Sequence, residues 1–91
     1  MMPIDLEQLR IFVAVAERGG FTRAAESLYI SHSTTSRAVS ALEEHLGVRL
    51  LERTSRSQCL TEAGVLLLEK GRELLGDALE LAERVSSLKK I

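Results

Sequence analysis

Cysteine and long hydrophobic runs are scarce in this chain of 91 residues, and each absence excludes a class of protein. The one cysteine, Cys59, has no second thiol for an internal disulfide and no histidine cluster beside it for a metal site. We therefore expect Cys59 to be a small, buried, apolar side chain. The longest apolar run, Ile11 to Ala16, is far too short to cross a bilayer, and the first ten residues carry Asp5 and Glu7 where a signal peptide is basic. These absences predict a cytoplasmic protein with no metal, no cofactor and no membrane partner.

Aromatic residues make up only 3% of the chain, so the core must be built from leucine, valine, isoleucine and alanine. That mixture favours helices. A chain of this length has room for one small domain rather than two.

An excess of positive charge is also missing. Twelve Lys and Arg stand against 13 Asp and Glu, which gives a net charge of -1 and a pI of about 6.1. A free DNA-binding module is usually basic. Cations nevertheless outnumber anions within residues 22–40 and 45–60, whereas acidic side chains predominate in the last helical segment. Two modest basic patches remain.

The apolar spacing predicts three helices before Gly47. The first begins after the capping residue Asp5 and ends at Gly19-Gly20. The second is short and has Thr22 as its cap. Its apolar face is formed by Ala24, Ala25, Leu28 and Tyr29. The third begins after Ser31, whose side chain can accept from free backbone amides, and stops at Gly47. Two helices separated by a turn of a few residues therefore result.

The amino-acid composition changes after the third helix. A hydroxyl-rich stretch, 52–57, separates Leu50-Leu51 from Cys59-Leu60, which predicts two very short antiparallel strands joined by an arginine-bearing loop. Thr61 then caps a fourth helix that continues to about Leu88.

Apolar residues in this fourth helix alternate by four and three, which is the seam of a helix that pairs with another helix. The residues that we assign to dimerisation are Leu67, Leu74, Leu75, Ala78, Leu81, Ala82, Val85 and Leu88. A small domain cannot cover so long a stripe, so we expect a second copy of the chain to cover it in a homodimer. Gly71 and Gly76 weaken the helix, and they mark either a place where another segment packs closely against it or a bend in the helix.

The predicted order is mainly α: a helix-turn-helix, then a basic hairpin, then a long helix. In that arrangement the third helix can enter the major groove, while the hairpin reaches the adjacent minor groove. The first two turns of the third helix contain short polar side chains and one arginine, which are suited to close contact with bases and phosphates. They are Ser31, His32, Ser33, Thr34, Ser36 and Arg37. The alternative is that the hydroxyls only cap the helix and Arg37 is a solvated charge. Capping is favoured for Ser31 and DNA contact for the others, with His32 evenly divided between contact and simple exposure.

Several ordered blocks cover nearly the whole chain: LRIFVAVAE at 9–17, FTRAAESL at 21–28, SR at 36–37, LEEHLGVRLLER at 42–53 and LTEAG at 60–64. Together they resemble the amino-terminal domain of LysR-type transcriptional regulators. The resemblance implies a winged helix-turn-helix that binds dyad-symmetric, double-stranded promoter DNA as a homodimer. Residues 1–60 would be the DNA-binding domain and residues 61–91 the linker and dimerisation helix.

The resemblance also implies roles for single residues. In that family the recognition helix touches bases and phosphates, the start of the preceding helix meets the sugar-phosphate backbone, and the wing arginines approach the minor groove or its phosphates. The matching residues are, in that order, Ser36 and Arg37, Thr22 and Arg23, and Arg53 and Arg56.

Two positions depart from the family pattern. His32-Ser33 stands where the family often has Gln-Pro, so the base preference is not carried over. Thr35 stands where the family usually buries Val, Leu or Ile, and its methyl group can do the same if its hydroxyl bonds a carbonyl one turn earlier. Members of the family are also considerably longer and carry an effector-binding domain. We therefore expect a shortened form or a natural fragment that binds DNA without a small-molecule effector.

An enzyme is the least favoured class, because the sequence has no nucleophile with a base, no glycine-rich phosphate loop and no metal-ligand spacing. The rival function is a helical protein-interaction module that does not contact DNA, which would fit the slightly acidic total charge. The salt dependence of binding distinguishes these two functions, because DNA binding weakens steeply as the salt concentration rises and apolar helix pairing does not.

Overall fold

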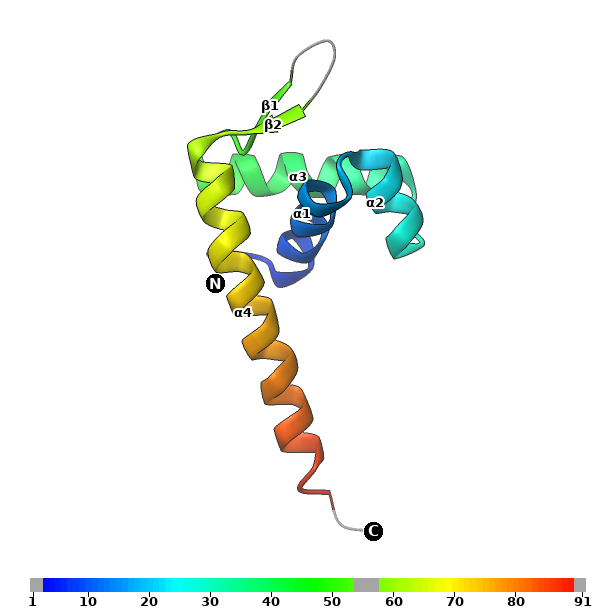
Figure 1. Cartoon of the computed structure of the whole chain (residues 1–91), viewed down its shortest axis with the longest axis vertical. Coiled ribbons are helices and arrows are strands. Elements are labelled where there is room, and N and C mark those ends of the chain that lie inside the picture. Colours follow the sequence, from blue (N-terminus) through cyan, green and yellow to red (C-terminus); the bar gives the residue numbers. More distant parts are fainter. Residues whose placement is uncertain (1–2, 54–57, 90–91) are drawn as a thin grey trace.

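The computed structural model describes residues 3–53 and 58–89. In order, the elements are α1 (Leu6–Arg18), α2 (Phe21–Leu28), α3 (His32–Leu46), β1 (Leu51–Arg53), β2 (Gln58–Leu60) and α4 (Glu62–Ser86). Figure 1 shows the first three helices grouped together, a hairpin projecting on one side and α4 extending away on the other. The predicted mainly α architecture, with a short hairpin before a long last helix, is confirmed.

Helix ends follow the predicted capping residues at most positions. Asp5, Ser31 and Thr61 each accept a hydrogen bond from the backbone N–H three residues later, at 2.9, 3.0 and 3.0 Å. These bonds satisfy amides that the first turn of a helix leaves free. Gly19 and Gly47 adopt the left-handed conformation, with φ of 83° and 73°, and end α1 and α3 as predicted.

The predictions for α2 were wrong at both ends. Thr22 does not cap the helix, which begins at Phe21 with Gly20 as its N-cap and no side-chain hydrogen bond there. Phe21 is 9% exposed, and its place in the core brings the helix start forward by two residues, from a cap at Thr22 to one at Gly20. Tyr29 is not on the buried face either: it ends the helix with a φ of 58° and is 95% exposed. The left-handed conformation turns the chain away from the helix, so its side chain leaves the apolar face.

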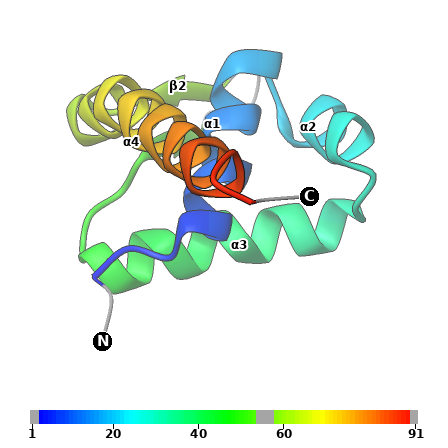
Figure 2. The same cartoon turned by 90° about the horizontal axis from the view of Figure 1, so that it is seen from below.

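The core lies around α1, which contacts each of the other three helices described. Figure 2 shows α1 enclosed by α2, α3 and α4. The largest fully buried side chains are Phe12, Leu9, Leu42, Leu50, Val15, Val39 and Thr35. Thr35 donates its hydroxyl proton to the Ser31 carbonyl at 2.9 Å, which is the bond to the preceding turn that its burial was predicted to need.

The hairpin pairs β1 with β2 in antiparallel register, with Leu51 opposite Leu60 and Glu52 opposite Cys59. Both predicted strands are confirmed, but the expectation that Cys59 is buried was wrong, because Cys59 is exposed. Successive side chains of a strand point to opposite faces. Since Leu51 is buried and its partner Leu60 half-buried, their face is the inner one, which leaves Cys59 on the outer face.

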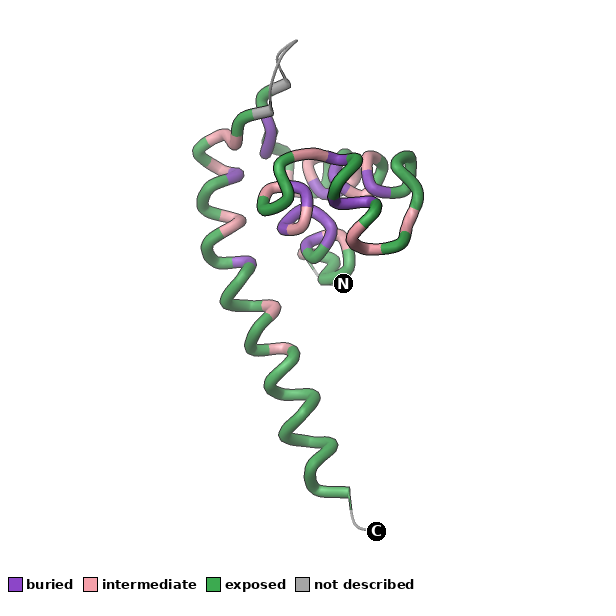
Figure 3. Tube along the Cα trace, turned by 45° about the vertical axis from the view of Figure 1, so that its right-hand side comes forward, coloured by how far each residue is buried: buried purple, intermediate pink, exposed green. Residues whose placement is uncertain are grey.

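Helix α4 packs on the domain only through its first half. Gly64 and Gly71 are buried in α4, whereas every residue from 79 to 89 is exposed, as Figure 3 shows. A Cβ atom at Gly71 would lie 2.9 Å from Leu9 Cδ1, and one at Gly76 would meet nothing within 4 Å. Of the two alternatives left by the sequence, Gly71 therefore marks a close approach. In the part of the chain that the structure describes, no helix is long and apolar enough to span a membrane.

Candidate nucleic-acid interface

The first two turns of α3 have one buried side and one polar, exposed side. Thr35 and Val39 face the core at 0% exposure. The exposed residues are Ser31, His32, Ser33, Thr34 and Arg37, with Ser36 half-buried beside them. The residues predicted to contact DNA on this helix therefore share the surface that its packing leaves open. We call this surface the α3 polar face.

Hydrogen bonds within the α3 polar face assign different roles to its hydroxyls. Ser31 Oγ accepts from the Thr34 backbone N–H at 3.0 Å and donates to Thr34 Oγ1 at 2.8 Å. Ser31 Oγ also lies 3.2 Å from Ser33 Oγ, which must be the donor because the single Ser31 proton is already used. Ser31 is thus fully engaged as a cap. Thr34 keeps its own hydroxyl proton, and Ser33 keeps acceptor lone pairs, for a ligand outside the protein.

The start of α2 adjoins the start of α3. The rings of Phe21 and His32 are 5.9 Å apart between centroids, at an interplanar angle of 52°. Thr22 and Arg23 follow Phe21 directly and are exposed. The structure therefore brings the residues predicted to meet the sugar-phosphate backbone next to the α3 polar face.

Arg23 and Arg37 form no ion pair within the described part of the protein. Among residues 3–53 and 58–89, Arg10, Arg49, Arg72 and Arg84 have carboxylate oxygens within 4.0 Å, but Arg23 and Arg37 do not. An unpaired, exposed guanidinium is suited to bind a phosphate or the edge of a guanine, because it presents several N–H donors in a planar fork.

The hairpin lies beyond α3, on the side opposite the free end of α4 (Figure 1). Arg53 is the last residue of β1, but its side chain and the whole of Arg56 lie outside the described residues. The backbone of β1 therefore fixes where the predicted wing begins.

Glu43 is a residue of this region that the sequence analysis missed. Its carboxylate accepts hydrogen bonds from the backbone N–H groups of Leu50 and Leu51, at 2.8 and 3.2 Å. These partners follow Glu43 by seven and eight residues, across the end of α3. No sequence periodicity relates a helical carboxylate to amides beyond a chain reversal, so the sequence carries no signal for this contact.

The residues predicted for dimerisation divide into two groups. Leu67 and Leu75 are half-buried and pack against the core of their own domain. The second group is exposed to solvent among the described residues: Leu74 at 44%, Leu81 at 64%, Val85 at 61%, Leu88 at 77%, and Ala82. Ala78, in the same stretch of α4, is half-buried. A contiguous row of large exposed apolar side chains is typical of a protein-protein contact.

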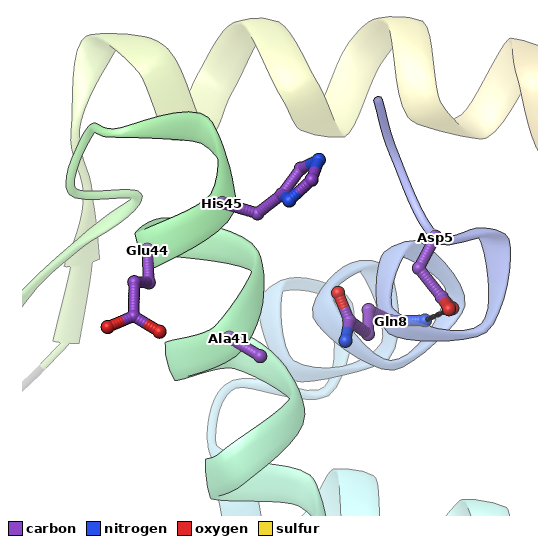
Figure 4. A pocket seen from close by; sticks show the side chains of 5 residues that line it. All are labelled: Asp5, Gln8, Ala41, Glu44 and His45. Atoms are coloured by element: carbon purple, nitrogen blue, oxygen red, sulfur yellow. Dashed lines mark hydrogen bonds between the residues drawn. The ribbon is translucent and has the colours of Figure 1, made fainter. Parts of the chain in front are cut away.

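A shallow hollow between α1 and α3 is lined by Asp5, Gln8, Ala41, Glu44 and His45. Figure 4 shows that these side chains do not converge: the Asp5 carboxylate faces the backbone N–H of Gln8, and Glu44 points away from both. In the described residues no group of three or more His, Cys, Asp or Glu could hold a metal ion. The hollow therefore offers no arrangement suited to general acid-base work or metal binding.

Comparison with known proteins places these features in a family. The family described as bacterial regulatory helix-turn-helix protein, lysR family, matches residues 6–65. The HTH-type transcriptional activator AllS of Klebsiella pneumoniae is 51% identical over 76 residues, which cover 84% of this chain and 28% of that protein. The SDS degradation transcriptional activation protein of a Pseudomonas species is 50% identical over 84 residues, covering 92% of this chain and again 28% of the relative. The chain thus spans little more than a quarter of these relatives.

Solved structures show the same fold in complexes with DNA. The DNA-binding domain of BenM, in a crystal structure with benA site 1 DNA, is 36% identical with a TM-score of 0.88 and covers 94% of this chain and 100% of that one. The DNA-binding domain of CbnR, also in a DNA complex, is 40% identical with a TM-score of 0.86 and covers 92% of this chain and 97% of that one.

Proposed function

Because this chain belongs to the LysR family of bacterial regulatory helix-turn-helix proteins, we propose that it binds double-stranded promoter DNA as a homodimer, with α3 in the major groove. The observation that carries the proposal is the α3 polar face. Ser33, Thr34 and the unpaired guanidinium of Arg37 are exposed, with Ser36 half-buried beside them, while the opposite side of the same helix is packed in the core. The family is one of transcriptional regulators, and the function is DNA recognition rather than catalysis.

Each residue of the surface has a proposed role. Ser33, Thr34, Ser36 and Arg37 approach base edges and nearby phosphates, and His32 lies at the edge of this contact. Ser31 holds the helix start, as its hydrogen bonds indicate. Thr22 and Arg23 contact the sugar-phosphate backbone, and Arg53 and Arg56 of the wing reach the minor groove or its phosphates. The DNA complexes of two relatives that are 36% and 40% identical support a DNA-binding role for this fold, and the roles of the single residues are our proposal.

Pairing through α4 is the second part of the proposal. Burying a leucine or valine side chain contributes about 1.5–3 kcal/mol, and association costs about 4–15 kcal/mol in lost freedom. A stable pair therefore needs several such side chains from each copy. The uncovered row from Leu74 to Leu88 supplies them. Residues 61–91 would be the linker and dimerisation helix, with its first turns packed on the DNA-binding domain formed by 1–60.

A dimer also explains how so small a domain binds a specific site. A single module that contacts few phosphates binds weakly, whereas linking two modules raises the effective concentration of the second into the millimolar range. Half-sites with dyad symmetry would lie about 34 Å apart along one face of the DNA, or a multiple of that distance. We propose this activity for the 91 residues themselves, without an effector, in the cytoplasm of a bacterium, where promoter DNA lies.

The test is a binding titration at several salt concentrations, on duplexes selected from a random pool. Wild-type affinity should fall steeply as salt rises. Arg37→Ala should weaken binding by about 1–3 kcal/mol. Arg84→Ala removes the same charge from the far end of α4 and should leave affinity nearly unchanged.

Two outcomes would contradict the proposal. If no duplex is retained at low ionic strength while the chain still self-associates regardless of salt, the protein is a helical interaction module instead. If Arg37→Ala and Arg84→Ala have equal effects on every duplex, Arg37 is not in the interface.

A further inference from the structure

The short segment 49–51, where the connection from α3 enters β1, is held by polar contacts on two sides. From α3, the Glu43 carboxylate accepts from the Leu50 and Leu51 N–H groups at 2.8 and 3.2 Å. From the start of α4, the Thr61 hydroxyl donates to the Arg49 carbonyl at 2.6 Å, and the Thr61 N–H donates to the Leu50 carbonyl at 3.0 Å. We call this set of contacts the junction clamp.

The Glu43 side of the junction clamp is largely buried, so water cannot easily replace its contacts. Leu50 and Leu51 are 1% and 2% exposed, and the side chain of Glu43 is 11% exposed. A buried amide that loses its acceptor stays unpaired, which is costly. Arg49 Nε lies 3.7 Å from Glu43 Oε2 and balances part of the carboxylate charge at the rim. The carboxylate is therefore the acceptor on which both amides depend.

The clamp connects the two elements that are proposed to touch DNA. Glu43 and Arg37 belong to the same helix, so the carboxylate holds a fixed place relative to the α3 polar face. Leu51 is the first residue of β1, so its N–H bond to Glu43 sets where the hairpin leaves the domain. Loss of the carboxylate would free the hairpin without removing any DNA-contacting side chain.

We propose that Glu43 is a positioning residue for DNA recognition, which holds the hairpin in register with α3. The proposal rests on the DNA-binding function proposed above. It predicts the direction in which DNA affinity changes when the carboxylate is lost. Removing a carboxylate from a DNA-binding protein should by itself strengthen binding to the negatively charged duplex. A loss of affinity after this removal must therefore come from lost positioning.

The test compares variants that alter charge and hydrogen bonding separately. Glu43→Gln removes the charge but keeps an acceptor oxygen, Glu43→Ala removes both, and Glu43→Asp keeps the charge on a side chain shorter by one methylene group. Glu44→Ala is the matched control, because Glu44 is the next residue of α3, is exposed and has no ion pair or hydrogen bond within the described residues.

We expect Glu43→Gln and Glu44→Ala to bind DNA as tightly as wild type or slightly more tightly. Glu43→Ala should bind roughly tenfold more weakly, the order of one lost hydrogen bond to a charged group. Glu43→Asp should also bind more weakly, although its charge is unchanged. The dependence of log affinity on log salt should flatten in Glu43→Ala by about one per phosphate contact that the hairpin loses.

Amide hydrogen exchange of Leu50 and Leu51 in the free proteins provides a readout that needs no DNA. Both amides should be protected in wild type and Glu43→Gln, and should exchange faster in Glu43→Ala and Glu43→Asp. If Glu43→Ala does not fold, Glu43→Asp and Glu43→Gln still decide the question.

The proposal is overturned if Glu43→Ala and Glu44→Ala bind DNA equally, or if Glu43→Gln is as weak as Glu43→Ala. If wild type itself binds no duplex, the proposed function fails and this role fails with it. Wild-type binding with no difference among the Glu43 variants overturns the positioning role alone.

Discussion

Gly64 and Gly76 belong to the same helix, α4, but a methyl group added to each would meet opposite surroundings. At Gly64 the new Cβ would lie 2.2 Å from the Leu50 carbonyl oxygen and 3.2 Å from Leu60 Cδ2. At Gly76 it would meet no atom within 4 Å. The same substitution, glycine to alanine, should therefore change the free energy of unfolding in opposite directions.

The size of each effect follows from these distances. Within a helix, alanine is favoured over glycine by about 1 kcal/mol, and Gly76→Ala should gain that amount. Gly64→Ala has the same gain, but its methyl group must push backbone apart, because the atom it meets is a carbonyl oxygen. Overpacking of this kind costs about 1–3 kcal/mol or more. The displaced carbonyl also accepts the Thr61 N–H at 3.0 Å, and weakening that bond costs about 1 kcal/mol. The net loss for Gly64→Ala is thus about 1–3 kcal/mol.

Thermal unfolding followed by circular dichroism, at one fixed protein concentration, would measure both effects. For a domain of this size, 1 kcal/mol corresponds to about 4–8 °C in Tm. Gly76→Ala should raise Tm by about that amount, and Gly64→Ala should lower it by at least as much. Fixed concentration is needed because dimerisation also raises Tm. Equal shifts in the same direction, or a higher Tm for Gly64→Ala, would refute the close packing of α4 on the Leu50 carbonyl.

Two further predictions concern the dimer and the core. Leu81 is 64% exposed, so Leu81→Asp should leave the fold of the single chain intact but separate the dimer. Sedimentation equilibrium that still shows a dimer would place the subunit contact elsewhere. Thr35→Val should change the free energy of unfolding by less than about 1 kcal/mol, because the Ser31 carbonyl that loses the hydroxyl at 2.9 Å still accepts the Thr35 N–H at 3.1 Å. A loss above about 2 kcal/mol in urea unfolding would mean that the hydroxyl has a larger role.

The features that the sequence alone predicted correctly are local ones. The caps at Asp5, Ser31 and Thr61 act on amides three residues away, and Gly19 and Gly47 end helices through their own backbone conformation. Helical and strand periodicity likewise depends on neighbours within one or two turns. The order of the elements and the polar composition of the α3 polar face could therefore be predicted without coordinates.

The features that the sequence did not predict depend on contacts between segments that are distant along the chain. Burial of Phe21 moved the start of α2, and the pairing of β1 with β2 placed Cys59 on the outer face. Packing on α1 distinguished Gly71, where an added Cβ atom would meet Leu9, from Gly76, where one would meet nothing within 4 Å.

The candidate site shows the same division. Its side chains could be named from the sequence, because they occupy successive turns of one helix. The sequence could not predict that Arg37 forms no ion pair. It also could not predict that the Glu43 carboxylate accepts hydrogen bonds from the Leu50 and Leu51 amides. Both depend on which groups meet after the chain has reversed direction, and no pattern of residue types along the chain records those distances.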